Sequence, residues 1–293
     1  MNIFSGLEEI VETNYALADQ TWFGLGGTAD FFIRPKTAKH LKDVIRRCNE
    51  NGVGIYMMGF GSNLLISDEG MRAAVIKLDA EEFKKIEFKN DQVTAGAGAE
   101  LSKVLMQSVQ KGLSGMEALT GIPGSVGGAV RMNAGGNFGD FGAVVESVTL
   151  MDNQGKIFEK SKPELEFDYR RTNIASKFIL SAHLNLNLAD PEQIMKIVKE
   201  IWIYKKNSQP LNTRNAGCIF KNPRGVSAGA LIDRAGLKGF RIGGAVVSDK
   251  HANFILAEQG CKSRDVMQMI EAIKDKVREQ YDIELELEIE IWK

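Results

Sequence analysis

The spacing of apolar residues up to residue 190 predicts short strands that alternate with helices. Thr37 can cap a helix in which Leu41, Val44, Ile45 and Cys48 recur at helical spacing. The same periodicity predicts a second helix over residues 100–111. Apolar runs bounded by turn residues predict strands over residues 31–36, 53–58, 73–78, 84–89, 92–97, 144–152 and 178–187.

The rest of the chain has stronger helix signals. Asp190 can cap a helix with Pro191 in its first turn. The buried stripe of this helix should consist of Ile194, Ile197, Val198 and Ile201. Further helices are predicted over residues 227–236 and 263–281, and strands over residues 217–221, 242–248, 252–257 and 283–292. In the last strand apolar residues alternate with four glutamates, so one face should meet the core.

These elements together predict an α+β fold. We expect two subdomains, at residues 1–80 and 81–189, and a C-terminal α+β domain at residues 190–293. The connector at residues 113–135 is long and rich in turn residues, and we interpret it as a loop without its own secondary structure. Long loops of this kind are usually functional.

Composition and charge exclude several classes of protein. The 293 residues include 37 basic and 38 acidic side chains, so no net charge attracts nucleic acid or an anionic membrane. No signal peptide and no apolar stretch of about 18 residues is present, so we expect no membrane insertion. The three cysteines include no CxxC pair, which argues against a disulfide framework and a zinc site. We expect a cytoplasmic protein without a metal or an obligate protein partner.

Glycine is enriched, and the excess gathers in loops where the backbone could approach a ligand closely. The segment Gly59–Asn63 follows a predicted strand and could hold a phosphate with its N–H groups, although a plain tight turn fits equally well. Leu64 stands where a dinucleotide-binding fingerprint would have its third glycine. A second loop, residues 121–135, has five glycines around Pro123, Ser125 and Asn133, and its spacing alone leaves a structural connector open.

The segment Thr213–Pro223 places one thiol, that of Cys218, among polar residues between two predicted helices. A thiol has an ordinary pKa of about 8.5, so it is mostly protonated at neutral pH and can act as an acid. The alternative is a small buried apolar side chain, which is the role we assign to Cys48. The neighbouring Lys221 and Asn222 favour a functional role for Cys218.

Together these segments resemble the UDP-N-acetylenolpyruvoylglucosamine reductases, flavoproteins of peptidoglycan precursor synthesis and cell-wall biogenesis, over nearly the whole chain. The two glycine loops and the segment Thr21–Gly27 are similar to the FAD-binding segments of the vanillyl-alcohol-oxidase (PCMH) type of fold. The resemblance implies that residues 1–80 and 81–189 bind FAD and that residues 190–293 bind substrate. The implied cofactor residues are Gly59, Gly61, Ser62, Asn63, Leu64, Gly121, Gly124, Ser125, Gly128 and Ala129. The three histidines lie outside these loops, so the FAD should be noncovalent.

The resemblance also implies a catalytic acid. The segment Ala216–Pro223 is similar to the family motif Ala-Gly-Ser-x-Phe-Lys-Asn-Pro, with Cys218 in place of the serine acid. Asn222 and Lys206 would then bind substrate, although Lys206 could equally interact with the carbonyls at a helix end.

An arginine and a glutamate complete the implied site. Arg170 follows Tyr169 as in the family's Tyr-Arg-x-Ser, so Arg170 would hold the substrate carboxylate near Tyr169, and Arg171 would be a solvated neighbour. Glu288 matches the second glutamate of Leu-Glu-Pro-Glu-Val, without the proline, and would pair with Arg170.

In the reaction that the resemblance implies, NADPH is the cosubstrate that reduces FAD. The reduced flavin then gives hydride to the β-carbon of UDP-N-acetylglucosamine enolpyruvate, and Cys218 protonates the α-carbon to form UDP-N-acetylmuramate. Two alternatives stay open: a flavin-dependent hydroxy-acid or alcohol oxidase, and a noncatalytic nucleotide-sugar-binding protein. The segment Ala216–Pro223 and Glu288 argue against the oxidase, whereas cysteine in place of serine is the feature that favours the binding protein.

Overall fold

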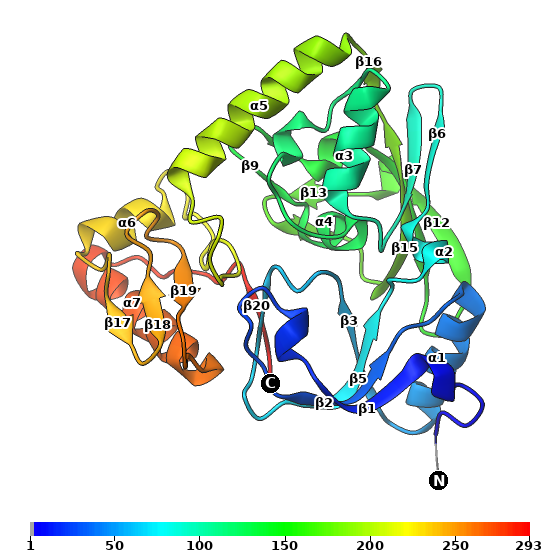
Figure 1. Cartoon of the computed structure of the whole chain (residues 1–293), viewed down its shortest axis with the longest axis horizontal. Coiled ribbons are helices and arrows are strands. Elements are labelled where there is room, and N and C mark those ends of the chain that lie inside the picture. The colour runs from blue at the N-terminus through cyan, green and yellow to red at the C-terminus, as the bar shows by residue number, and fades with distance from the viewer. Residues whose placement is uncertain (1–2) are drawn as a thin grey trace. The chain divides into compact units, whose positions relative to one another are not determined.

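The computed structural model describes residues 3–293, and the chain folds into two compact units. Unit 1 comprises the chain up to Asn14, Asp30–Phe60 and Arg72–Tyr204, and unit 2 comprises Tyr15–Ala29, Gly61–Met71 and Lys205–Lys293 (Figure 1). Two short N-terminal segments thus belong to the same unit as the C-terminal residues, because Phe23, Leu25 and Leu65 are part of its apolar core. The predicted domains were continuous segments, and their functional assignment stays a prediction.

A four-stranded sheet with strand order β1-β2-β5-β3 lies at the start of the fold. Its strands are β1 Val11–Ala16, β2 Thr28–Ile33, β3 Gly54–Met58 and β5 Met71–Lys77. Helix α1 Ala38–Glu50 connects β2 to β3 and buries the four apolar residues predicted for it. Its cap is also confirmed, because the Thr37 hydroxyl accepts the His40 N–H at 3.2 Å. β3 and β5 are parallel, and β3 carries the chain toward the first glycine loop.

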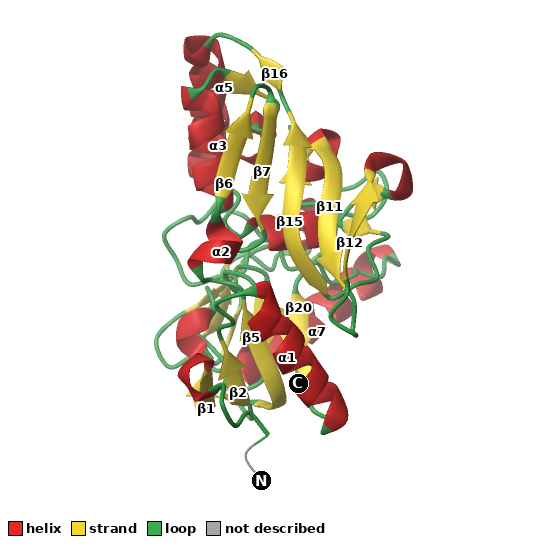
Figure 2. Cartoon of the chain, turned by 90° about the vertical axis from the view of Figure 1, so that its right-hand side faces the viewer, coloured by secondary structure: helices red, strands yellow, loops and turns green. Residues whose placement is uncertain are grey.

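Unit 1 also contains a five-stranded antiparallel sheet with the strand order β12-β11-β15-β7-β6 (Figure 2). Its strands are β6 Ile86–Lys89, β7 Gln92–Gly96, β11 Val145–Met151, β12 Ile157–Ser161 and β15 Phe178–Asn185. Short elements connect them: α2 Glu81–Lys84, β8 Leu113–Ser114, β9 Gly135–Gly136, β10 Gly139–Asp140, β13 Phe167–Asp168, β14 Arg171–Thr172 and β16 Asn187–Leu188. Helix α3 Leu101–Gln110 confirms the second predicted helix.

The prediction that residues 113–135 are a loop without secondary structure is wrong. They contain β8, a 3-10 turn at Glu117–Leu119 and the helix α4 Val126–Met132. Two glycines lower the intrinsic helix propensity of α4, so its sequence does not read as helical. The helix forms because Ser125 caps it, accepting the Gly128 N–H at 3.2 Å, and because Val126, Ala129 and Val130 are buried. It packs against β15 and β7.

Helix α5 Pro191–Ser208 begins where predicted, with the Asp190 carboxylate accepting the Glu192 N–H at 2.9 Å. Ile194, Val198 and Ile201 are buried as predicted, but Ile197 is 45% exposed, so that part of the prediction is wrong. At 3.6 residues per turn Ile197 lies about 70° around the helix from the centre of the buried stripe.

Unit 2 is built from two helices and two small sheets. Helix α7 Ser263–Tyr281, with the bounds predicted, packs on β17 and β18 of the antiparallel sheet β17 Arg241–Ile242, β18 Ala245–Val247 and β19 Ile255–Ala257 (Figure 1). Helix α6 Ala228–Arg234 precedes this sheet, and β4 Leu64–Ile66 pairs in parallel with β20 Glu290–Trp292. No helix among residues 3–293 combines the length and the apolar character needed to span a membrane.

Two strand predictions in unit 2 are wrong, one of them entirely and the other in its length. Residues 217–221 form no strand, and of residues 283–292 only Glu290–Trp292 does. An isolated bridge between Phe220 and Leu287 joins the two segments. Most of the remaining backbone hydrogen bonds of residues 219–221 go to Asn253, Glu286 and Glu288 rather than to a regular ladder.

Candidate active site

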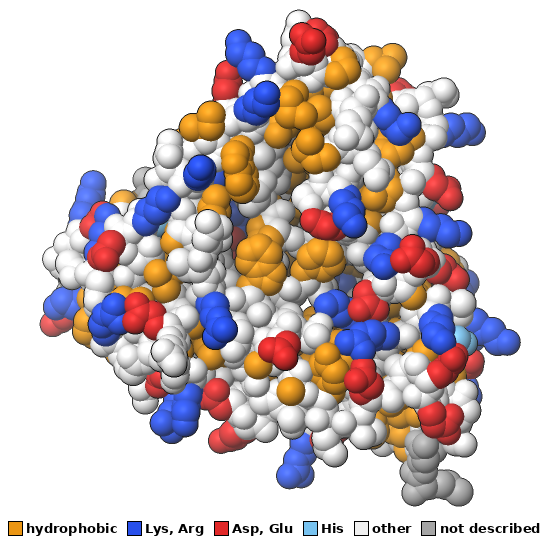
Figure 3. All heavy atoms as spheres, in the orientation of Figure 1, with side chains coloured by type: hydrophobic (Ala, Val, Ile, Leu, Met, Phe, Trp, Pro, Cys, Tyr) orange, Lys and Arg blue, Asp and Glu red, His pale blue; other side chains and the backbone are white. Residues whose placement is uncertain are grey.

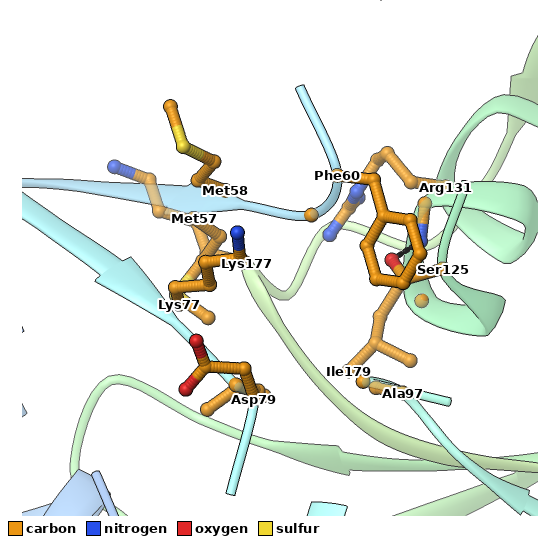
Figure 4. Close-up of a pocket in the computed structure, with 15 residues that line it drawn as sticks. Met57, Met58, Phe60, Lys77, Asp79, Ala97, Ser125, Arg131, Lys177 and Ile179 are labelled. Carbon is orange, nitrogen blue, oxygen red and sulfur yellow. Dashed lines mark hydrogen bonds between the residues drawn. The ribbon is translucent and has the colours of Figure 1, made fainter. Parts of the chain in front are cut away.

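A cavity in unit 1 lies where β3 ends and α4 begins (Figure 4). Three of the predicted cofactor residues, Gly59, Ser125 and Gly128, line it. The other lining residues are Met57, Met58, Phe60, Lys77, Leu78, Asp79, Ala97, Gly98, Gly127, Arg131, Lys177 and Ile179. The cavity therefore brings the start of the first glycine loop, at Gly59, to the middle of the second, at Ser125, although the two residues lie 66 positions apart in sequence.

The glycines at this cavity are required by close approach of the backbone. A Cβ added to Gly59 would lie 2.7 Å from the Ser125 hydroxyl, and one added to Gly98 would lie 1.7 Å from the Leu78 carbonyl oxygen. Larger residues at either position would push the walls apart and fill the space between them.

Cationic side chains outnumber anionic ones along the cavity wall. Figure 4 shows Lys77, Lys177 and Asp79 on one side and Arg131 with Ser125 on the other. Burial lowers the pKa of Lys77. Arg131 donates to the carbonyls of Ile174 and Ser176, and the Lys177 ammonium donates to the Ile55 carbonyl at 3.3 Å.

A wall of three cations, one carboxylate and close-packed glycine backbone suits an anionic ligand group such as the diphosphate part of FAD. Sequence reasoning missed the four charged residues. Arg131 could have been found from the sequence, because it lies inside the second glycine loop. Lys77 and Lys177 carry no local signal, since only the fold brings them to the glycine loops.

The remaining predicted cofactor residues lie elsewhere. Gly121, Gly124 and Ala129 belong to unit 1 but do not line this cavity, and Gly61, Ser62, Asn63 and Leu64 belong to unit 2. A Cβ on Gly61 would meet the Gln20 carbonyl oxygen at 2.0 Å, and the Asn63 amide donates to the Glu288 carbonyl at 3.0 Å. Both contacts give these residues a packing function inside unit 2, and their contact with the cofactor stays a prediction.

In unit 2, backbone hydrogen bonds join the segments that carry two of the predicted catalytic residues, Cys218 and Glu288. The Glu288 N–H donates to the carbonyl of Ile219, the residue after Cys218, at 2.8 Å. Glu288 is half-buried, whereas Glu284, Glu286 and Glu290 are exposed. The alternation of apolar residues and glutamates does not distinguish the four glutamates, whereas burial separates Glu288, the one that matches the family motif, from the others.

The loop before Cys218 is held by a buried asparagine. Asn215 is 5% exposed, and its side-chain oxygen accepts the Gly217 N–H at 2.9 Å while its amide donates to Pro210 and Thr213. Gly217 has a φ of +76°, which favours glycine at this turn. The half-buried Cys218 thiol thus follows a defined turn rather than a flexible loop.

Arg170 lies in unit 1, at the turn between β13 and β14. Its φ is +55°, and its guanidinium lies 5.0 Å from the centre of the exposed Tyr169 ring. Arg171 is exposed and forms an ion pair with Asp168 at 2.7 Å. Asn133, which is 1% exposed, holds this hairpin by donating to the Asp168 carbonyl at 3.0 Å.

The two residues predicted to bind substrate in unit 2 have local structural contacts. The Asn222 oxygen accepts the Ala228 N–H at 3.0 Å at the start of α6. The Lys206 side chain is exposed, and its carbonyl accepts the Lys250 ammonium at 2.5 Å. The neighbouring Lys205 is 7% exposed, so Lys205 is the buried lysine at this end of α5 and Lys206, the predicted residue, is not.

Comparisons with known families place these features in a class of enzyme. Residues 29–161 match a family described as "FAD binding domain". Residues 209–292 match the family "UDP-N-acetylenolpyruvoylglucosamine reductase, C-terminal domain". With the cavity between the glycine loops, these matches define an FAD-dependent oxidoreductase.

Relatives and solved structures identify the family. The chain is 37% identical to the UDP-N-acetylenolpyruvoylglucosamine reductase of Clostridium tetani, over 96% of this chain and 92% of that protein. It is 38% identical to the reductase of Bacillus subtilis, over 96% and 93%. The crystal structure of the reductase from Thermus caldophilus superposes with a TM-score of 0.84 at 36% identity, covering 97% of this chain and 98% of that one. The chain belongs to the UDP-N-acetylenolpyruvoylglucosamine reductase family.

A more distant likeness extends to the fold alone. A glucose dehydrogenase, wild-type Phl p 4.0202, superposes on 65% of this chain with a TM-score of 0.50 at 13% identity, covering 45% of that protein. The predicted family, the α+β fold with an FAD-binding module and a C-terminal domain, and the FAD cofactor are confirmed. The enzyme is an FAD-dependent reductase of peptidoglycan precursor synthesis.

Proposed function

We propose that the enzyme uses NADPH to reduce UDP-N-acetylglucosamine enolpyruvate to UDP-N-acetylmuramate, with Cys218 as the proton donor. The observation that carries this proposal is the hydrogen bond from the N–H of half-buried Glu288 to the carbonyl of Ile219, the residue after Cys218. The segments that carry Cys218 and Glu288 are about seventy residues apart in sequence, and backbone hydrogen bonds join them.

Reducing an enol ether conjugated to a carboxylate needs a hydride at the β-carbon, a proton at the α-carbon and positive charge near the carboxylate. FAD, when bound noncovalently by residues that include Gly59, Ser125 and Gly128, supplies the hydride. Cys218 holds the proton on its sulfur and delivers it to the α-carbon.

Arg170 and Glu288 contribute charge. The Arg170 guanidinium binds the substrate carboxylate and stabilises the negative charge that develops on it. Glu288 orients charged groups in the unit that carries Cys218, and the half-buried position of its side chain supports this role. The positive φ of Arg170 supports a functional position as well, because such strain in a non-glycine residue is frequent at active sites.

Binding of the nucleotide sugar by Tyr169, Lys206 and Asn222 is part of the proposal, with exposed Tyr169 beside Arg170 as its best support. We also propose the cytoplasm as the location, since no disulfide joins cysteines among residues 3–293. Both substrates are small molecules, so the reaction itself requires no protein partner.

The first prediction tests Cys218 by separating the two halves of the reaction. In Cys218→Ala, NADPH should bleach the flavin at the wild-type rate, because reduction of FAD needs no thiol. Reoxidation of the reduced flavin by the enolpyruvyl substrate should slow by about 10²–10⁴-fold, the usual contribution of a general acid. Cys218→Ser should retain turnover, and stopped-flow absorbance measures both steps.

The matched control is Cys261→Ala, which removes the other half-buried thiol of unit 2 and should leave both steps unchanged. Wild-type reoxidation rates in Cys218→Ala would contradict the assignment of the acid. Reoxidation by oxygen that outpaces reoxidation by the enolpyruvyl substrate would instead favour an oxidase.

A further inference from the structure

A single buried side chain holds the backbone that follows Cys218. Asn253 is 2% exposed and lies just before β19. Its side-chain oxygen accepts the Phe220 N–H at 3.0 Å, and its amide donates to the Phe220 carbonyl at 2.7 Å. The main-chain carbonyl of Asn253 also accepts the Ile219 N–H at 2.8 Å. Three hydrogen bonds to one residue thus fix the two residues after Cys218.

The opposite side of the same segment contacts the chain around Glu288. The Ile219 carbonyl accepts the Glu288 N–H at 2.8 Å, and the Lys221 N–H donates to the Glu286 carbonyl at 2.8 Å. Ile219 therefore lies between Asn253 and Glu288. Residues 217–221 belong to no regular strand. Asn253 therefore makes the hydrogen bonds to their backbone that a neighbouring strand would make in a sheet.

We propose that Asn253 is a positioning residue for the reaction: it fixes the Cys218 segment in register with Glu288, so that the thiol reaches the α-carbon of the substrate. This inference rests on the proposed function of Cys218 and Glu288. Asn253 lies 35 residues from Cys218 in sequence and outside the segment Thr213–Pro223.

The chemistry of this contact requires an amide. Asparagine can accept the Phe220 N–H and donate to the Phe220 carbonyl at the same time. Ionised aspartate has the same shape but only accepts, so its second oxygen would face the Phe220 carbonyl with no proton between them. A protonated carboxyl regains one donor and restores the pattern of the amide.

The test is therefore Asn253→Asp, measured in single turnovers. The flavin is reduced with dithionite under anaerobic conditions and mixed with the enolpyruvyl substrate. At neutral pH the rate constant for reoxidation should fall by about 10²-fold, the effect of a displacement of about 1 Å at a reacting group. As pH falls the rate constant should recover toward the wild-type value. An effect on folding alone would lower the amplitude and leave the rate constant unchanged.

Controls isolate Asn253 from other groups. Asn212→Asp adds the same charge at an exposed position in unit 2 and should change nothing. Wild type, measured over the same pH range, accounts for titration of Cys218, Glu288 and His251, whose Nδ1 accepts the Asn253 N–H at 3.3 Å. Asn253→Ser serves if the aspartate variant does not fold: it should be slow at every pH, because its hydroxyl cannot bridge both groups of Phe220.

The decisive comparison combines Asn253→Asp with Cys218→Ala. If Asn253 acts through the thiol, its substitution should add less than about threefold to the loss in Cys218→Ala. A full additional loss of about 10²-fold, or a wild-type rate constant in Asn253→Asp with a slow Cys218→Ala, overturns the positioning role and leaves the proposed function intact. A wild-type rate in Cys218→Ala would instead overturn the proposed function.

Discussion

Neighbouring residues of the same type have different environments at the candidate site. Arg170 occupies a turn position with positive φ, whereas Arg171 is exposed and paired with Asp168. Glu288 is half-buried, whereas exposed Glu286 lies 3.5 Å from the Lys221 ammonium. Arg170 and Glu288 thus each have a nearby residue of the same charge. That residue forms an exposed ion pair, which contributes little to stability.

The second prediction concerns Arg170→Ala and Glu288→Ala. Each should slow reoxidation of the reduced flavin by substrate without lowering the FAD content, because neither residue lines the cavity of unit 1. If the two residues act on the same developing charge, the double variant should lose less than the product of the single effects. Stopped-flow absorbance of the reduced enzyme measures all three rates.

Arg171→Ala and Glu286→Ala are the matched controls and should be nearly neutral. A strong loss in these controls, with normal rates in Arg170→Ala and Glu288→Ala, would show that both assignments are wrong and that Arg171 and Glu286 occupy the functional positions. A multiplicative loss in the double variant would mean that Arg170 and Glu288 act independently.

At the scale of elements, a distant carboxylate holds the start of α7. Asp68, in the turn after β4, accepts hydrogen bonds from the Ser263 N–H at 2.9 Å, the Ser263 hydroxyl at 2.7 Å and the Arg264 N–H at 3.1 Å. Burial alone would raise the pKa of Asp68, but these hydrogen bonds outweigh it and the pKa lies below its ordinary value. Negative charge at this helix N-terminus is stabilising.

The third prediction is that Asp68→Ala lowers the thermal stability of the enzyme. Loss of a helix-capping contact costs about 0.5–1 kcal/mol at a partly exposed position, which lowers Tm by roughly 1–4 °C. Because the folded-state pKa of Asp68 is depressed, its contribution is present above its ordinary pKa of about 3.9. The contribution disappears as pH falls through the lower, folded-state value. The Tm difference between wild type and variant should therefore shrink in acid.

Glu69→Ala, at the exposed neighbouring position, is the control and should not change Tm. A Tm difference for Asp68→Ala that stayed constant from neutral to acid pH would contradict a role for the Asp68 charge at this helix.

At the scale of the whole molecule, the candidate cofactor cavity and the proposed proton donor belong to different units. The cavity lined by Gly59, Ser125 and Gly128 is in unit 1, and Cys218 with Glu288 is in unit 2. Charged side chains of both signs are mixed over the face seen in Figure 3, and their totals in the chain, 37 basic and 38 acidic, are nearly balanced. We therefore expect recognition of anionic ligands to depend on local groups such as Lys77, Arg131 and Lys177.

The fourth prediction is that the purified enzyme carries about one noncovalent FAD per chain. Among the residues lining the cavity of unit 1 there is no histidine that could attach the flavin: His40 lies in α1, His183 in β15 and His251 in unit 2. Acid precipitation should release the flavin into the supernatant, where its absorbance gives the stoichiometry. Flavin that stayed with the precipitated chain would contradict a noncovalent site.

The sequence by itself determined the elements whose signals are local. Thr37 and Asp190 cap α1 and α5, and the spacing of apolar residues marks α3 and α7, because capping and helical periodicity act over three to seven residues. The motif around Cys218 could also be recognised in the sequence, because its residues are contiguous. This motif indicates the family.

Only the tertiary structure decided the rest, because the contacts join residues far apart in the chain. Asn253 bonds to Phe220 across 33 positions, and Asp68 bonds to Ser263 across 195. Helix α4 forms despite its glycines because β15 and β7 bury it, and Lys77 meets Lys177 at one cavity through the pairing of distant strands. No pattern within one segment contains these pairings, so the sequence showed which chemistry the chain carries, and the fold showed which side chains hold it in place.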